Sequence, residues 1–191
     1  GVLPSVVTGS IFGTSNDSSR RDENWRVIAV PAGWTGKPGE MGYDAYAVST
    51  MGTLPAPTDY TENGVDYDSE WYIAPRNSKD ALPGATTPYN WIVAQDFTVL
   101  RPGTYDFSFV GTADDIMSFY IGGDLSGAGT NTPTITDGQQ IGTSFRNWRD
   151  MNTFDGRATL ESGTHTAYMV LNDTGGATFA FIGDSSFELP V

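Results

Sequence analysis

The sequence predicts an all-β protein, an antiparallel β-sandwich or jelly roll with almost no helix. Short apolar runs alternate with polar residues at a period of two, which is strand periodicity. The 23 Gly and 11 Pro residues stand between these runs, where they favour turns. No segment sustains the i, i+3, i+4, i+7 apolar spacing of a capped helix. Roughly ten such strands are typical of a sandwich, and 191 residues suit one domain, 1–191.

The N-terminal 70 residues contain the weaker strand patterns. A short strand is expected over 6–12, followed by a polar loop over 15–23. The apolar, β-branched run WRVIAV over 25–30 predicts a second strand, which Pro31 ends because proline has no N–H to donate to a sheet. After it come a Gly- and Pro-rich loop over 33–42, loose alternation over 43–51, and a tight turn at Asn63-Gly64.

The strongest strand pattern begins at Tyr89. Residues 89–99 form an apolar run, and the turn-forming residues 101–104 follow it. Residues 105–110 then alternate between aromatic and other side chains, and 116–121 alternate again. Because each turn is short, we expect these strands to pair with one another as hairpins.

The remaining C-terminal residues predict further short strands. Strands are expected around Ile135, Ile141 and Phe145, with a Gly-, Thr- and Asn-rich loop before them over 125–134. Later strands are expected over 156–160, 165–171, 178–183 and 185–191, with an acidic loop over 172–176. Alternation in these runs predicts a core that includes Phe97, Tyr105, Phe107, Phe109, Phe119, Ile121, Tyr168 and Val170.

The net charge narrows the classes of partner. Formal charge is −13, from 23 acidic and 10 basic residues, so nothing here would neutralise a nucleic-acid backbone, and anionic membrane surfaces are disfavoured. No apolar run approaches the roughly 20 residues of a membrane helix, so we expect no membrane insertion. Such acidity fits an extracellular or surface-exposed protein, on a cell or a virion; simple solubility would also explain it. The chain has no Cys, which excludes disulfides and thiolate metal sites.

Two acidic segments are candidate metal sites. Asp114 and Asp115 are adjacent carboxylates between two predicted strands, and Asn172-Asp173 precede a Gly pair. Neighbouring carboxylates repel each other, and a hard cation such as Ca²⁺, which prefers oxygen ligands, removes that cost. The alternatives are a solvated turn for Asp114-Asp115 and an ordinary hairpin turn for Asn172-Asp173.

The C-terminal part of the chain, about 70–185, resembles the PA14-like family of β-sandwich modules. The matching pieces are FTV with PGTYDF over 97–107, Asp114-Asp115 followed by FYIGG over 119–123, and ATLESGTH with AYMV over 158–170. Their order and spacing agree with the family, whereas residues 1–70 do not look like its usual start.

The resemblance implies a Ca²⁺ site and a sugar ligand. In lectin members of that family two adjacent aspartates bind Ca²⁺, which in turn binds sugar hydroxyls, and a second loop often adds an Asn or Asp. Asp114 and Asp115 match the aspartate pair, and Asn172 and Asp173 occupy a comparable place to the second loop. The implied partner is a glycan or cell-surface polysaccharide.

Trp148, Arg149 and His165 are further candidates for binding or catalysis. Trp148 with Arg149 could stack on and hydrogen-bond a sugar, although core packing is the commoner fate of Trp, and Trp34 and Trp91 are expected to be structural. His165 is the single histidine, has no G-x-S-x-G elbow to serve and no His partners for zinc, so a structural role is expected. Acidic pairs are too common here to indicate a glycosidase.

Two functions follow from these observations. The first is a Ca²⁺-dependent carbohydrate-binding module for adhesion, within an extracellular or surface protein. The second is a structural β-sandwich, such as a virion decoration protein or a spacer in a surface appendage, which would contact neighbouring modules or subunits. We expect no enzyme activity.

Overall fold

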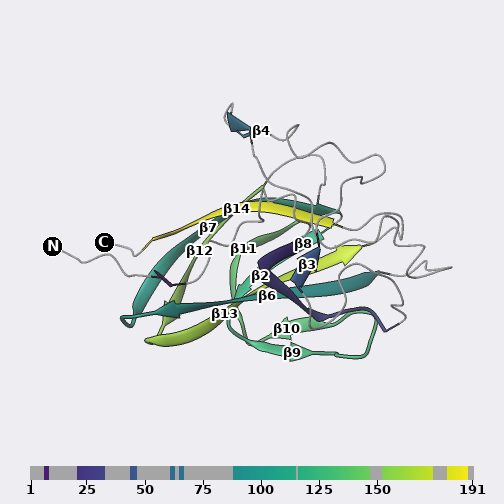
Figure 1. The fold of residues 1–191 in the computed structure, drawn as a ribbon, viewed down its shortest axis with the longest axis horizontal. Helices are drawn as coiled ribbons and strands as arrows, with labels where there is room; N and C mark the ends of the chain where they lie inside the picture. The colour runs from purple at the N-terminus through teal and green to yellow at the C-terminus, as the bar shows by residue number, and fades with distance from the viewer. Residues whose placement is uncertain are drawn as a thin grey trace.

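Two antiparallel sheets pack face to face, and a short hairpin lies beneath one of them (Figure 1). The computed structural model describes residues 7–8, 21–32, 44–46, 61–62, 65–66, 88–114, 116–146, 152–173 and 180–188. These residues contain no helix, and therefore none long and apolar enough to cross a membrane. The predicted β-sandwich is confirmed.

The larger sheet has seven strands in the described residues. Their order is β11-β8-β13-β6-β2-β3, and β1 pairs with the end of β6. All of the pairings are antiparallel. The strands are β1 Val7–Thr8, β2 Arg21–Ala29, β3 Asp44–Tyr46, β6 Tyr89–Val99, β8 Ile116–Ile121, β11 Gln139–Arg146 and β13 Gly163–Asp173.

The smaller sheet and two hairpins complete the described fold. The order of the smaller sheet is β12-β7-β14, and the hairpins are β9–β10 and β4–β5. Glu62 of β4 pairs with Val65 of β5, so only Asn63-Gly64 separates the two strands, in agreement with the predicted turn. The strands are β4 Thr61–Glu62, β5 Val65–Asp66, β7 Gly103–Asp114, β9 Asp124–Ser126, β10 Thr134–Thr136, β12 Asn152–Leu160 and β14 Ala180–Glu188.

The prediction that β6, β7 and β8 pair as hairpins is wrong. β6 and β8 belong to the larger sheet and β7 to the smaller one, so the chain crosses the sandwich twice in this stretch. Both strands of each expected pair carry core aromatics, and these rings meet across the core instead of lying in one sheet. Phe97 of β6 and Phe107 of β7 meet edge to face, with ring centroids 6.1 Å apart, across the interface between the sheets. A hairpin would have placed them in one sheet instead.

Several strand boundaries also differ from those expected. β2 begins at Arg21, inside the expected polar loop, because Arg21 and Asp22 pair with Tyr46 and Ala45 of β3. β9 overlaps the start of the expected loop over 125–134, and β12 starts four residues before the expected strand. The two expected C-terminal strands are one strand, β14, since Asp184 pairs with Val110 and continues the ladder. In each case pairing with a neighbouring strand extends a polar segment.

The core between the sheets is aromatic. Phe109 of the smaller sheet contacts Phe119 of the larger sheet, with centroids 5.5 Å apart, and also Phe154 at 6.0 Å. Trp25 and Trp91 are fully buried in the same cluster, as expected for Trp91. Six of the eight predicted core residues are buried here: Phe97, Tyr105, Phe107, Phe109, Phe119 and Ile121.

The other two predicted core residues, Tyr168 and Val170, face the opposite side of the larger sheet. In β13 it is Ala167, Met169 and Leu171 that enter the core between the sheets, so the even-numbered residues point outward. Val170 is buried in a second, smaller cluster on this outer face, and Tyr168 is only partly buried against it. The cluster forms because the β9–β10 hairpin covers part of the face; its buried members are Ala29, Ile92, Ile135 and Val170.

Gly142 marks an irregularity in β11. The register of β11 against β8 shifts between Ile141 and Phe145. Gly142 has a φ of +69°, and a Cβ placed on it would lie 2.9 Å from the Cα of Phe154 in β12. The bend at Gly142 therefore lets the edge of one sheet approach the edge of the other closely.

We expect Gly142→Ala to lower the free energy of unfolding by about 2–4 kcal/mol, because it adds both left-handed backbone strain and a clash with the β12 backbone. Gly129→Ala is the matched control: its φ is +83°, but nothing lies within 4 Å of the added Cβ, so only about 1–2 kcal/mol should be lost. Urea denaturation measures both. Equal losses would show that the close approach at Gly142 does not matter.

Candidate functional site

The two acidic segments end at the same end of the sandwich. Asp114 is the last residue of β7 and pairs with Ala180, while Ile116 starts β8 in the other sheet. Ile116 pairs directly with Asn172, near the end of β13. Asp115, which joins β7 to β8, lies outside the described residues. The register therefore brings the Asp114 end of β7 and the Asn172 end of β13 together.

Asn172 and Asp173 are strand residues, which corrects the expectation that they open a loop. Each pairs with a residue of β6, Asn172 with Asn90 and Asp173 with Tyr89. The Nδ2 of Asn172 donates to the Oδ1 of Asn90 at 2.6 Å, so a side-chain bond reinforces the ladder.

Asn90 also ties the β9–β10 hairpin to the larger sheet. Its Nδ2 donates to the carbonyl oxygen of Pro133 at 3.0 Å, and its backbone N–H donates to that of Asn131 at 2.9 Å. Asn90 thus links β6, β13 and the segment that enters β10.

The chemistry of the predicted donors fits a hard cation, since all four residues offer oxygen atoms. Across the side chains that the structure describes, no three or more His, Cys, Asp or Glu come together as a metal site. The side chains of Asp114, Asp115 and Asp173 are not among those described. Ca²⁺ binding by Asp114, Asp115, Asn172 and Asp173 therefore stays a prediction.

Trp148 and Arg149 also lie outside the described residues, as does Trp34. His165 is placed, and its contacts are structural. Its Nε2 bonds to the backbone carbonyl oxygen of Glu161 at 2.6 Å, and its ring lies against Phe97 with centroids 5.8 Å apart. The imidazole thus closes the turn between β12 and β13.

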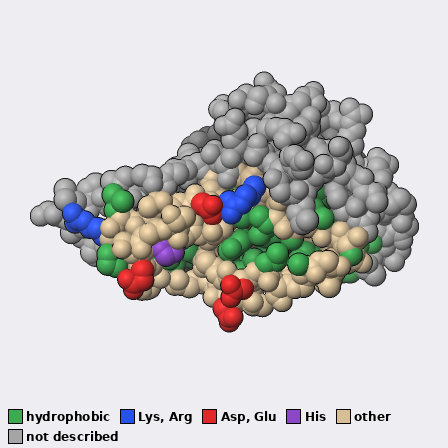
Figure 2. Space-filling model, turned by 60° about the horizontal axis from the view of Figure 1, so that its bottom comes forward, with side chains coloured by type: hydrophobic (Ala, Val, Ile, Leu, Met, Phe, Trp, Pro, Cys, Tyr) green, Lys and Arg blue, Asp and Glu red, His purple; other side chains and the backbone are tan. Residues whose placement is uncertain are grey.

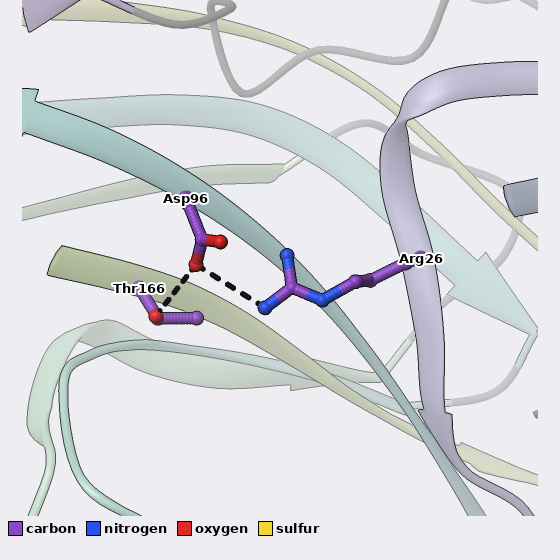
Figure 3. A network of polar contacts seen from close by, with 3 residues as sticks. All are labelled: Arg26, Asp96 and Thr166. Atoms are coloured by element: carbon purple, nitrogen blue, oxygen red, sulfur yellow. Dashed lines mark hydrogen bonds and ion pairs between the residues drawn. The ribbon is translucent and has the colours of Figure 1, made fainter. Parts of the chain in front are cut away.

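A polar network that the sequence did not reveal spans three strands on the outer face of the larger sheet (Figure 3). The Oδ1 of Asp96 in β6 accepts a hydrogen bond from Thr166 of β13 at 2.8 Å and lies 3.2 Å from the Nη2 of Arg26 in β2. The side chains of Arg26 and Asp96 are 41% and 50% exposed. Both bonds engage the same carboxylate oxygen, Oδ1, as the dashed lines in Figure 3 show.

Two tyrosines lie side by side on the same face. Tyr120 of β8 and Tyr168 of β13 are direct cross-strand partners, and both are partly buried against the outer cluster. Figure 2 shows hydrophobic side chains gathered in the middle of this face, beside a basic and an acidic side chain. The alternation in HTAYMVL was the signal available in the sequence, but it fits either face of the strand equally well.

No protein-family model matches the sequence, and no curated protein matches it. Among solved structures, the chain is similar to a CBM35 from Cellvibrio japonicus Abf62, with 10% identity, 90% of this chain and 96% of that chain covered, and a TM-score of 0.39. It is also similar to the N-terminal cellulose-binding domain of Cellulomonas fimi β-1,4-glucanase C, with 14% identity, 75% and 99% covered, and a TM-score of 0.38.

A PA14 domain, from the MpAFP antifreeze protein, is a third similar structure, with 16% identity, 91% and 87% covered, and a TM-score of 0.26. At TM-scores this low, the likenesses carry no argument about what this chain binds. They include β-sandwich modules of more than one kind, so the specific resemblance to the PA14-like family stays a prediction.

We expect Asn90→Ala to lower the free energy of unfolding by about 1–3 kcal/mol, because it leaves the Asn172 amide and the Pro133 carbonyl without their partner. Thr98→Val is the control in the same strand: Thr98 shares only a 3.4 Å, solvent-exposed contact with Thr164, so less than about 0.5 kcal/mol should be lost. Chemical denaturation of both variants checks this. A loss for Asn90→Ala as small as that of the control would contradict it.

Proposed function

We propose that this chain is a Ca²⁺-dependent carbohydrate-binding module, whose metal would be held by Asp114, Asp115, Asn172 and Asp173. The observation that carries the proposal is the pairing of Ile116 with Asn172, because it brings the segment that follows Asp115 next to the second oxygen-rich segment. In this proposal, two segments more than 50 residues apart supply the donors.

The chemistry of these residues suits a hard cation such as Ca²⁺. Carboxylate and amide oxygens are hard ligands, and Ca²⁺ accepts six to eight of them in a flexible geometry. When bound, the ion supplies open coordination positions that paired sugar hydroxyls can fill in place of water. The protein's part is to hold the donors in place, and the Asn172–Asn90 bond does this for Asn172.

One sugar held by so few contacts binds weakly, in the millimolar range or about −4 kcal/mol. Many copies on one surface would raise the effective concentration, which suits adhesion by an extracellular or surface protein. Trp148 and Arg149 are our proposals for side chains that contact the sugar beside the metal.

We expect Ca²⁺ to raise the melting temperature of metal-free protein, and the double variant Asp114→Asn with Asp115→Asn to abolish the rise. A ligand at 100 times its dissociation constant that binds only the folded state adds about 2.7 kcal/mol, which is readily measured by differential scanning fluorimetry. Asp124→Asn with Asp155→Asn is the control, since it removes the same charge from exposed positions elsewhere. No rise at millimolar Ca²⁺ in the unmodified chain would leave Asp114-Asp115 as a solvated turn.

We expect binding to a glycan array, displayed at high valency with Ca²⁺, to include signals that disappear in EDTA and return with Ca²⁺. The same signals should be absent from the Asp114→Asn, Asp115→Asn variant. If the array is flat with Ca²⁺ present, the structural role as a spacer or decoration protein is favoured instead.

A further inference from the structure

We propose that the outer face of the seven-stranded sheet is a second glycan-binding surface, independent of Ca²⁺, that takes an uncharged oligosaccharide chain lying across the strands. It is centred on Tyr120 and Tyr168. This surface does not depend on the metal site, because none of its residues is among the proposed Ca²⁺ donors.

Strand register places five residues in one row across the sheet. Gln140 of β11 pairs with Tyr120, Tyr120 with Tyr168, Tyr168 with Ala94 of β6, and Ala94 with Arg26 of β2. Neighbouring strands lie about 4.8 Å apart, so the row spans about 19 Å. The two tyrosines are second and third in the row, and a hydrogen-bonding side chain stands at each end. A row of this length is longer than one sugar ring, which is why we infer an oligosaccharide.

Packing orders both tyrosine side chains before a ligand binds. Both pack against the outer cluster that Ile92, Ile135 and Val170 form, which restricts their rings while leaving part of each side chain exposed. Tyr offers a large, rigid and amphipathic contact at low entropic cost, and the C–H face of a sugar ring can stack on it. Because the rings are already packed, little ordering is needed on binding.

Hydrogen-bonding groups flank the aromatic pair on both sides. On one side lies the network of Arg26, Asp96 and Thr166. On the other side the hydroxyls of Ser118 and Ser144 lie 2.6 Å apart, and Gln140 donates to Ser144 at 3.4 Å. Side chains fixed by each other in this way present donors and acceptors in set positions, as sugar hydroxyls require.

The charges of this surface favour an uncharged glycan. Arg26 is paired with Asp96, so the network brings no net charge to the row. A chain with a net charge of −13 repels polyanionic glycans unless a basic patch compensates, and Arg26 is the one basic residue of the row. Figure 2 shows a hydrophobic area on this face with basic and acidic side chains beside it.

The test is affinity electrophoresis and calorimetry of the full chain in EDTA, with soluble uncharged polysaccharides (β-glucan, xylan and mannan) and their oligosaccharides of increasing length. We expect binding that survives EDTA and strengthens with chain length until the row is filled. Tyr120→Ala with Tyr168→Ala should weaken it by at least about tenfold, whereas Tyr→Phe at both positions should retain most of it, since stacking remains.

Two further variants keep the result interpretable. Arg26→Ala with Gln140→Ala changes only the ends of the row and should weaken binding severalfold even if the double Tyr→Ala variant folds poorly. Asp114→Asn with Asp115→Asn should leave binding in EDTA unchanged, so failure of the metal site and failure of this surface are told apart. The proposal is overturned if no uncharged polysaccharide binds in EDTA, if the tyrosine and row-end variants bind as the unmodified chain does, or if a polyuronate binds more tightly.

Discussion

The antiparallel ladder between β6 and β13 runs without a break from the pairing of Val99 with Gly163 to that of Tyr89 with Asp173. An uninterrupted ladder fixes which residues of both strands face the core, since one residue of slip would turn every side chain to the other face. In β13 the ladder sends Met169 into the aromatic core and leaves Tyr168 outside. The remaining strands of the larger sheet are placed from this central pair.

The same ladder carries both proposed surfaces. At its end it sets Asn172 beside Asn90 and opposite Ile116, and thereby brings the oxygen-rich segments together. In its middle it sets Tyr168 beside Tyr120. The two surfaces differ in how they would hold a sugar, one through a cation and the other through aromatic stacking. They lie at different positions along the same strand, so one glycan chain or two separate glycans could engage the module.

Strand positions were predictable because they depend on local patterning, and β6 was predicted with its observed bounds. The partnership of strands was not, because Phe97 and Phe107 show the same alternation whether they share a sheet or face each other across the core. The phase of β13 was not predictable either: HTAYMVL has apolar residues at both odd and even positions, and only the β9–β10 hairpin, through Ile135, explains why Val170 is also buried.

The site residues show the same limit. Asp114 and Asp115 stand out in the sequence because they are adjacent, and no pattern is needed to notice them. Arg26 and Asp96 lie 70 residues apart, and neither is unusual where it stands. Their contact exists only because β2 and β6 are neighbours in the sheet, and no local feature of either segment encodes that pairing. A surface assembled from several strands therefore cannot be predicted from the sequence until the strand order is known.

The central ladder also governs how the chain can fold. Asn90 and Asn172, which bond to each other, are 82 residues apart, and the strands from β7 to β12 lie between them in the sequence. Closing so long a loop costs conformational entropy before the contacts between the two strands can offset it. Topologies of this kind therefore fold on the scale of milliseconds to seconds. During synthesis β6 emerges well before its partner β13. Until β13 is made, β6 has no partner for its apolar residues, which include Trp91, Ile92 and Val93. During this interval the protein is most prone to associate with other copies of itself.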